Sequence, residues 1–156
     1  MATGLTPREF TWVIKGRLAV SERVGGYGDH HRRIRREEEL TWLDEQGFTA
    51  VLSLCPSSDG LVHYREAGFE PIHLPVTPGA ESELAPTFFA RLEEALGEGN
   101  ATVLVHRDFI DDTIVGLLGG YLVASGMLES PVQATAIIQE ISGRPLGPLG
   151  RSLIPG

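Results

Sequence analysis

Short apolar runs alternate with longer amphipathic segments from one end of this chain to the other. The short runs are rich in β-branched and aromatic residues, as buried strands are, and they cover residues 10–14, 17–20, 49–54, 71–74 and 102–105. The longer segments place apolar residues at helical spacing, and they cover residues 32–46, 61–67, 84–96, 114–123 and 131–141. This alternation predicts an α/β fold in which helices flank a central, mainly parallel sheet.

Polar, glycine-rich or proline-rich segments join and flank these elements. Residues 21–31 contain three glycines and predict a mobile loop, and residues 75–83 predict a second loop. We expect residues 1–9 to form a loose N terminus and residues 144–156 to form an irregular C-terminal tail. A length of 156 residues with 42% hydrophobic content fits a single domain over residues 1–156.

Composition and charge exclude several classes of protein. A formal net charge of −8 argues against general binding to nucleic acids or to anionic membranes. The single cysteine, Cys55, cannot form an intramolecular disulfide or a zinc ribbon, and we expect no cofactor. Residues 1–8 do not resemble a signal peptide, and the apolar stretch 114–128 is too short for a membrane span. We therefore expect a cytoplasmic protein, and the sequence leaves its oligomeric state open.

The stretch 102–123 combines a buried strand, a short polar loop and a long apolar helix. In α/β proteins this arrangement places an anion on the loop amides and the helix N terminus. Here the loop carries Asp108, Asp111 and Asp112 and no glycine. These carboxylates would repel an anion, so the arrangement favours a phosphate site while the residues argue against one.

Four segments resemble the small atypical dual-specificity protein phosphatases of the cysteine-dependent protein tyrosine phosphatase superfamily. Residues 10–19 read FTWVIKGRLA and are similar to the opening of that family. Residues 47–54, GFTAVLSL, resemble its next buried strand. Residues 103–106, VLVH, resemble the strand that enters the catalytic loop, and residues 119–124, GGYLVA, resemble the helix that leaves it. The resemblance implies a protein tyrosine phosphatase-like fold over most of the chain.

The catalytic loop of that family reads H-C-x-x-G-x-x-R-(S/T). Its cysteine thiolate attacks phosphorus, its glycine permits a cradle of amide groups, and its arginine binds two phosphoryl oxygens. In this chain the histidine position is His106, and Arg107 occupies the position of the cysteine. Ile110 stands at the glycine position, Thr113 at the arginine position, and Ile114 at the hydroxyl position. The loop is therefore a degenerate phosphate-binding loop.

The family's general acid is missing from its expected place as well. The resemblance puts an aspartate directly after a proline in the loop that follows residues 71–74, and this chain reads Pro75-Val76 there. Glu81 and Glu83 follow later in the same loop. This chain thus lacks four features of the family at the expected positions: the nucleophilic cysteine, the anion-binding arginine, the loop glycine and the general acid. The sequence predicts a catalytically inactive phosphatase-like protein that acts by binding, and we expect a protein partner whose identity the sequence does not give.

The loop side chains allow other interpretations. His106, Asp108, Asp111 and Asp112 could hold a cation, with Asp29, His30 or His31 from the preceding loop, in an enzyme or a small-ligand sensor of another class. The simpler interpretation is a structural, hydrogen-bonded His106 and aspartates that cap the helix after the loop.

Three further interpretations concern arginines and the cysteine. Arg107 is expected to form an ion pair with Asp111 or Asp112 in place of a bound anion. The alternative is that the positively charged end of the Arg107 side chain binds a small anion. Cys55 reads as a half-buried core residue, not a displaced nucleophile. A cluster of four arginines opens the helix predicted for residues 32–46, and it consists of Arg32, Arg33, Arg35 and Arg36. This cluster could be a docking patch for an acidic partner, or a solvated helix face neutralised by the glutamates 37–39.

Overall fold

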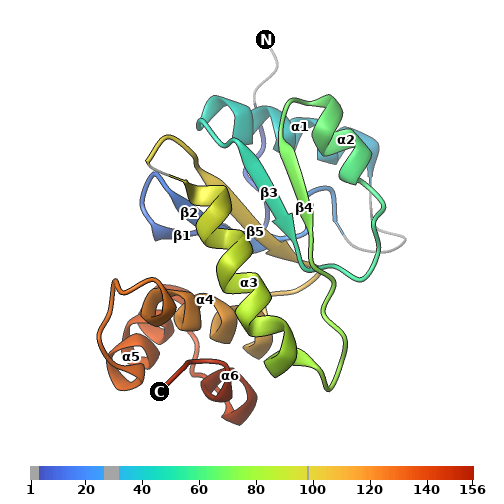
Figure 1. Ribbon diagram of the computed structural model, residues 1–156. Helices are drawn as coiled ribbons and strands as arrows, with labels where there is room; N and C mark the ends of the chain where they lie inside the picture. Colours follow the sequence, from blue (N-terminus) through green and yellow to red (C-terminus); the bar gives the residue numbers. More distant parts are fainter. Residues whose placement is uncertain (1–3, 27–31, 98) are drawn as a thin grey trace. The chain divides into compact units, whose positions relative to one another are not determined.

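The computed structural model of this protein describes residues 4–26, 32–97 and 99–156. The chain divides into two compact units (Figure 1). The first comprises Met1–Pro75 and Leu96–Ile110, and the second comprises Val76–Ala95 and Asp111–Gly156. A single domain over residues 1–156 stays a prediction.

The first unit is built on a five-stranded sheet with strand order β1-β2-β5-β3-β4. β1 pairs antiparallel with β2, and the remaining neighbours are parallel. The strands are β1 (Thr11–Ile14), β2 (Leu18–Glu22), β3 (Ala50–Ser53), β4 (Glu70–His73) and β5 (Val103–Arg107). All five predicted strands are present, so the predicted mainly parallel sheet is confirmed. β2 and β5 each run two residues beyond their predicted ends.

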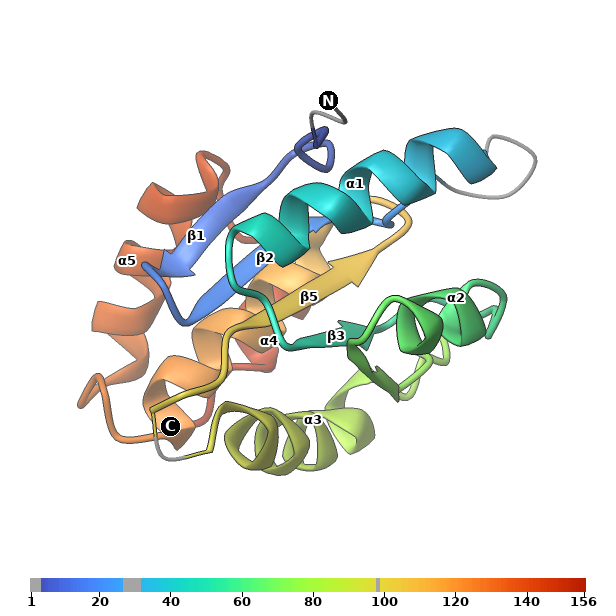
Figure 2. The same ribbon diagram turned by 90° about the horizontal axis from the view of Figure 1, so that it is seen from above.

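Two helices cover one face of this sheet, α1 (Arg33–Glu45) and α2 (Leu61–Glu66) (Figure 2). Leu40 and Leu43 of α1 and Tyr64 of α2 are buried in one cluster with side chains from the strands beneath them. The strand residues in this cluster are Ala19, Val51 and Leu104. Parallel strands are buried on both faces, which explains why their sequences are almost continuously apolar.

The segments before β1 and after β2 are more ordered than the sequence predicts. Residues 4–9 form no helix or strand, yet the Leu5 N–H donates to the Glu38 carbonyl (3.0 Å) and Arg8 accepts from the Glu22 N–H (2.9 Å). The predicted mobile loop 21–31 is wrong at its start, because Ser21 and Glu22 belong to β2 and residues 23–26 are buried. Residues 27–31 lie outside the described residues.

The second unit is helical. It contains most of α3 (Glu81–Leu96) together with α4 (Asp112–Ala124), α5 (Pro131–Ser142) and α6 (Pro148–Ser152). α3 starts three residues before the predicted residue 84, and α4 starts two residues before the predicted residue 114. Among the described residues, no helix combines the length and the apolar character needed to cross a membrane.

The C-terminal tail is part of the packed interior of this second unit. The prediction of an irregular tail is wrong for residues 148–152, which form α6, and Leu153 and Ile154 are buried. A Cβ atom on Gly116 would lie 2.5 Å from the Gly150 carbonyl oxygen, and one on Gly120 would lie 2.6 Å from that of Leu153. The glycines of α4 therefore allow the chain's own tail to approach the helix backbone.

Candidate functional site

The candidate site of the first unit lies where the parallel strands β2, β5 and β3 end. His106 is in register with Ser21 on one side and with Ser53 on the other. Two residues further along, the chain places Arg23, Asp108 and Cys55 after these same three strands. The carboxyl ends of parallel strands are where α/β proteins usually bind their ligands.

His106 is fully buried and neutral. Its Nδ1 accepts a hydrogen bond from the Val24 N–H (3.2 Å), so the ring proton is on Nε2. The pKa of His106 is lowered from 6.5 to about 3, mainly by burial and in addition by the charges of Arg23 and His73. Nε2 has no hydrogen-bond partner among the described residues. The prediction of a structural histidine is confirmed, and its partner belongs to the segment after β2.

Arg23 and Asp108 form an ion pair at this edge of the sheet, with side chains that are 7% and 26% exposed. The Arg23 guanidinium lies 3.8 Å from Asp108 Oδ1 and donates a hydrogen bond to the Asp59 carbonyl oxygen (2.9 Å). Sequence analysis does not identify Arg23 as a site residue. Its pairing with Asp108 follows from the register of β2 with β5, in which Glu22 lies opposite Arg107 and the next residues of the two segments are Arg23 and Asp108. The predicted pairing of Arg107 with Asp111 or Asp112 stays a prediction, since those residues lie in different units.

Cys55 is a buried thiol at the same edge of the sheet. It is 1% exposed, and burial raises the pKa of its thiol to about 11. A hydrogen bond with Ser53 lowers this pKa, while the nearby carboxylate of Asp108 raises it. A thiol in this state stays protonated and unreactive near neutral pH. The prediction that Cys55 is a core residue is confirmed, but the residue is fully buried and not half-buried as predicted.

Residues 111–113 belong to the second unit, at the start of α4. Asp111 is the N-cap residue of α4, and its Oδ1 accepts from the Ile114 N–H (3.1 Å). Asp112 instead accepts from the N–H groups of Gly147 (2.7 Å) and Gly150 (2.6 Å). The capping prediction is therefore confirmed for Asp111. It is wrong for Asp112, which caps α6 and not its own helix.

The predicted cation cluster is not assembled by the described residues. No three of their His, Cys, Asp or Glu side chains are placed to share a metal ion. Asp111 and Asp112 direct carboxylate oxygens to backbone amides, and the Nδ1 of His106 accepts from an amide as well. The additional ligands suggested by the sequence, Asp29, His30 and His31, lie outside the described residues.

The arginine cluster of α1 is divided among different environments. Arg33 and Glu37 form an exposed pair at 3.8 Å, as their spacing predicts. Arg35 lies 2.7 Å from Glu39, which is fully buried and also accepts from the Gly25 N–H (2.8 Å). Arg36 is buried, so of the four arginines only Arg32 and Arg33 are exposed.

Comparison with known proteins identifies the fold. No protein-family model and no curated protein sequence matches this chain. Kinase associated phosphatase, solved with its catalytic cysteine replaced by serine, matches with a TM-score of 0.73 and 16% identity over 96% of this chain and 93% of that chain.

Two other phosphatase structures match over nearly the whole chain. The active form of Tk-PTP has a TM-score of 0.71 and 20% identity, over 94% of this chain and 92% of its own. The core catalytic domain of the PP-IP phosphatase Siw14 from S. cerevisiae, in complex with citrate, has a TM-score of 0.66 and 16% identity, over 97% and 87%. The fold of this protein is thus the one shared by the cysteine-dependent protein tyrosine phosphatases and dual-specificity phosphatases.

Proposed function

We propose that this protein is a catalytically inactive phosphatase-like domain that acts by binding another protein. The observation that carries the proposal is the state of its single cysteine. Cys55 is 1% exposed, and burial raises the pKa of its thiol to about 11, so the thiol stays protonated near pH 7. The position that holds the nucleophile in the resembling family is occupied by Arg107, which cannot attack phosphorus.

The charges of the loop support the same proposal. Asp108 pairs with the buried Arg23, Asp111 caps α4, and Asp112 caps α6. Each carboxylate thus has a structural partner. Thr113, at the position of the family's anion-binding arginine, is 4% exposed and brings no positive charge. These residues stabilise the loop without a phosphoryl group.

An exposed aromatic side chain on the loop favours a role in binding protein. Phe109 lies between Asp108 and Ile110 and is 51% exposed. Aromatic residues carry much of the binding energy at protein interfaces, because they bury a large area at a small cost in conformational entropy. The loop therefore presents an apolar contact point in place of a nucleophile.

Hydrolysis of para-nitrophenyl phosphate tests the catalytic half of this proposal. We expect no turnover above the blank, alongside an active cysteine-dependent phosphatase as positive control. Turnover that copurifies with the protein and disappears in Cys55→Ala or Arg107→Ala would overturn the proposal. Turnover that persists in both variants would indicate a contaminating phosphatase.

Affinity capture tests the binding half. A partner that binds through the loop is expected to bind the wild-type protein and lose at least tenfold in affinity with Phe109→Ala. Val132→Ala is the matched control, because Val132 is also an exposed apolar residue and lies on α5. Equal binding by both variants would place the interaction elsewhere.

A further inference from the structure

Arg36 is a buried cation for which the described residues supply no carboxylate partner. Its side chain belongs to α1 and is 8% exposed, and its Nε atom is buried with no hydrogen-bond acceptor among the described residues. No ion pair is formed between Arg36 and any described carboxylate. A guanidinium cannot escape this situation by losing its proton, because its pKa is too high. An unpaired buried charge is costly, so an anion that reached Arg36 would be bound favourably.

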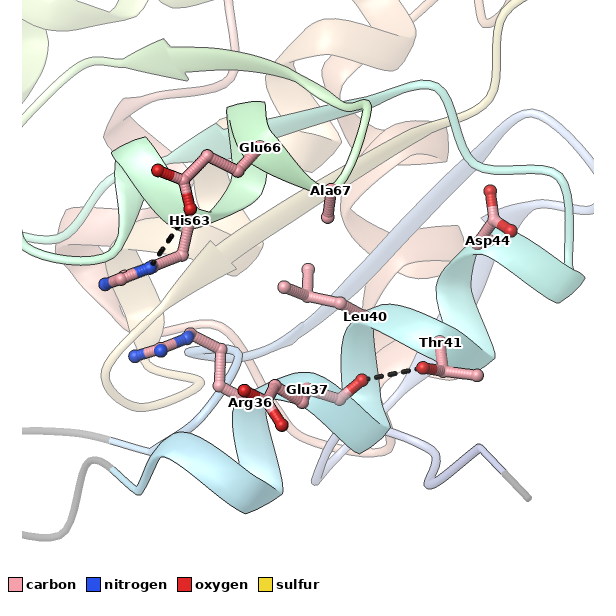
Figure 3. A pocket seen from close by; sticks show the side chains of 8 residues that line it. All are labelled: Arg36, Glu37, Leu40, Thr41, Asp44, His63, Glu66 and Ala67. Atoms are coloured by element: carbon pink, nitrogen blue, oxygen red, sulfur yellow. Dashed lines mark hydrogen bonds and ion pairs between the residues drawn. The ribbon is translucent and has the colours of Figure 1, made fainter. Parts of the chain in front are cut away.

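Arg36 lines a pocket between α1 and α2 in the first unit, with a volume of about 390 Å³ (Figure 3). Figure 3 shows the side chains of Arg36 from α1 and His63 from α2 directed toward the same end of this pocket. The other polar lining side chains are Glu37, Thr41, Asp44 and Glu66. Thr41 already donates its hydroxyl proton to the Glu37 carbonyl oxygen (2.8 Å). The remaining donors at this end are Arg36 and His63, and the Nδ1 of His63 lies 3.9 Å from the Glu66 carboxylate.

We propose that this pocket binds a carboxylate, with Arg36 as its principal partner and His63 as a second donor. The planar guanidinium matches the two oxygens of a carboxylate. The carboxylates on the rim select a singly charged ligand, because they would repel a phosphate dianion about twice as strongly. The side chains of Glu37 and Glu66 are 62% and 69% exposed, so water and salt weaken their repulsion of a monoanion.

Two sources can supply this carboxylate, a small organic acid or a glutamate or aspartate side chain of a partner protein. The second source would extend the proposed binding role of this protein. The pocket shares no residue with the loop at 106–113, so the pocket and the inactive-phosphatase proposal can fail independently.

The binding test is an NMR titration of backbone amides with sodium acetate, with sodium chloride at equal ionic strength as the reference. We expect saturable shifts in acetate that are confined to α1 and α2. Arg36→Met is expected to abolish them, while Arg33→Met, the matched control on the same helix, retains them. Acetate shifts no larger than those in chloride, or equal binding by Arg36→Met, would overturn the proposal.

A thermal melt of the unliganded variants separates a binding residue from a structural one. Methionine keeps most of the aliphatic stem of Arg36 and removes an unpaired charge, so Arg36→Met is expected to melt at the wild-type temperature or above it. A clear fall in its melting temperature would show that the guanidinium holds the fold together, which contradicts the proposal. Arg36→Lys keeps the positive charge but loses the planar guanidinium that can donate to both carboxylate oxygens, so it is expected to weaken acetate binding severalfold.

A pair of peptides distinguishes the two sources. One peptide carries a single glutamate between neutral residues, and in the other this residue is glutamine. Binding of the glutamate peptide at least tenfold tighter than acetate, with loss in the glutamine peptide, identifies a protein side chain as the occupant. Equal affinity for acetate and the glutamate peptide identifies a small organic acid. A glutamine peptide that binds as well as the glutamate peptide would contradict carboxylate recognition.

Discussion

Arg23 is a buried arginine of the first unit with an ion-pair partner. Its side chain is 7% exposed, and its guanidinium lies beside the partly buried Asp108 and donates to the Asp59 carbonyl oxygen. Replacing one member of a buried ion pair leaves the other charge buried alone, which usually costs more than the pair itself contributes. We expect Arg23→Met to lower the free energy of unfolding by about 2–3 kcal/mol, as measured by urea denaturation.

The double variant Arg23→Met, Asp108→Leu supplies the critical comparison. It removes both charges, so it is expected to recover most of the stability lost in the single variant. Arg33→Met, which breaks the exposed pair with Glu37, is the control and is expected to change stability by less than about 0.5 kcal/mol. A double variant no more stable than Arg23→Met would show that the ion pair is not the source of the loss.

His106 makes the stability of the protein depend on pH in the acidic range. Its pKa is about 3 in the folded protein and 6.5 when exposed in the unfolded chain. Between these values the unfolded chain binds a proton that the folded protein does not, so the free energy of unfolding decreases as the pH falls from 6.5 toward 3. The contribution of a neutral, buried His106 is fully present above pH 6.5.

Urea denaturation at several pH values measures this dependence. We expect His106→Asn to flatten the part of the curve between pH 6.5 and 3, because the asparagine amide does not titrate and its oxygen can accept from the Val24 N–H. The same slope in wild type and variant would mean that other groups, and not His106, cause the acid sensitivity.

At the scale of elements, hydrophobic periodicity locates the strands and helices but not their polar ends. β5 continues through His106 and Arg107, and α4 begins at Asp112. A pattern that depends on apolar side chains assigns such residues to a loop, because it does not register a polar residue that extends a strand or opens a helix. The predicted loop of eight residues, 106–113, is therefore shorter in the structure.

Two features of the candidate site depend on long-range contacts that no local pattern contains. The pair of Arg23 and Asp108 follows from the pairing of β2 with β5, which are far apart in the sequence. α6 occupies a stretch rich in glycine and proline that reads as irregular, and its stability comes from packing against α4 and from Asp112. The family's loop motif identifies which positions of this chain form the loop. It does not contain the residues from other segments that contact the loop, so those contacts could not be predicted.

Asp112 links two helices, and its removal is expected to release the tail. Its carboxylate accepts two short hydrogen bonds from the N–H groups of Gly147 and Gly150 at the start of α6. We expect Asp112→Ala to lower the free energy of unfolding by about 2–3 kcal/mol, because two amide groups lose a charged acceptor. Limited proteolysis should then cut within residues 143–156 much faster than in wild type.

Ser130→Ala is the matched control for this change. Ser130 is the N-cap residue of α5 and accepts from the Gln133 N–H (3.1 Å), so its loss is expected to cost about 1 kcal/mol without exposing the tail. Equal proteolysis of the tail in both variants would show that Asp112 has no special part in holding α6.

At the scale of the whole molecule, the fold and the chemistry of the loop depend on different residues. The sheet is specified by buried strand residues such as Leu18, Val51 and Leu104, none of which belongs to the loop. Solved phosphatases with 15–20% identity share the fold over nearly its full length, which shows how little of the sequence the fold requires. A loop can therefore lose its chemistry while the fold persists, and function has to be argued from the site.

Restoring the two best-known catalytic side chains is not expected to restore activity. In Arg107→Cys, Thr113→Arg, the new thiol would lie next to Asp108, whose negative charge opposes formation of a thiolate. Thr113 is 4% exposed, so an arginine there is crowded by its surroundings. Ile110 still occupies the glycine position, and Val76 still stands where the resembling family has its general acid. We expect hydrolysis of a phosphotyrosine peptide by this variant to stay at the level of the blank.

A graded series of variants tests this expectation. Adding Asp108→Ser, Ile110→Gly and Val76→Asp in turn removes the opposing charge, frees the backbone and supplies an acid, and turnover is expected only after these additions. The comparison must include circular dichroism and a thermal melt, so that a silent variant is known to be folded. Efficient hydrolysis by the double variant alone would mean that Asp108, Ile110 and Val76 do not oppose catalysis. The cysteine and the arginine would then be the only side chains that this loop needs for hydrolysis.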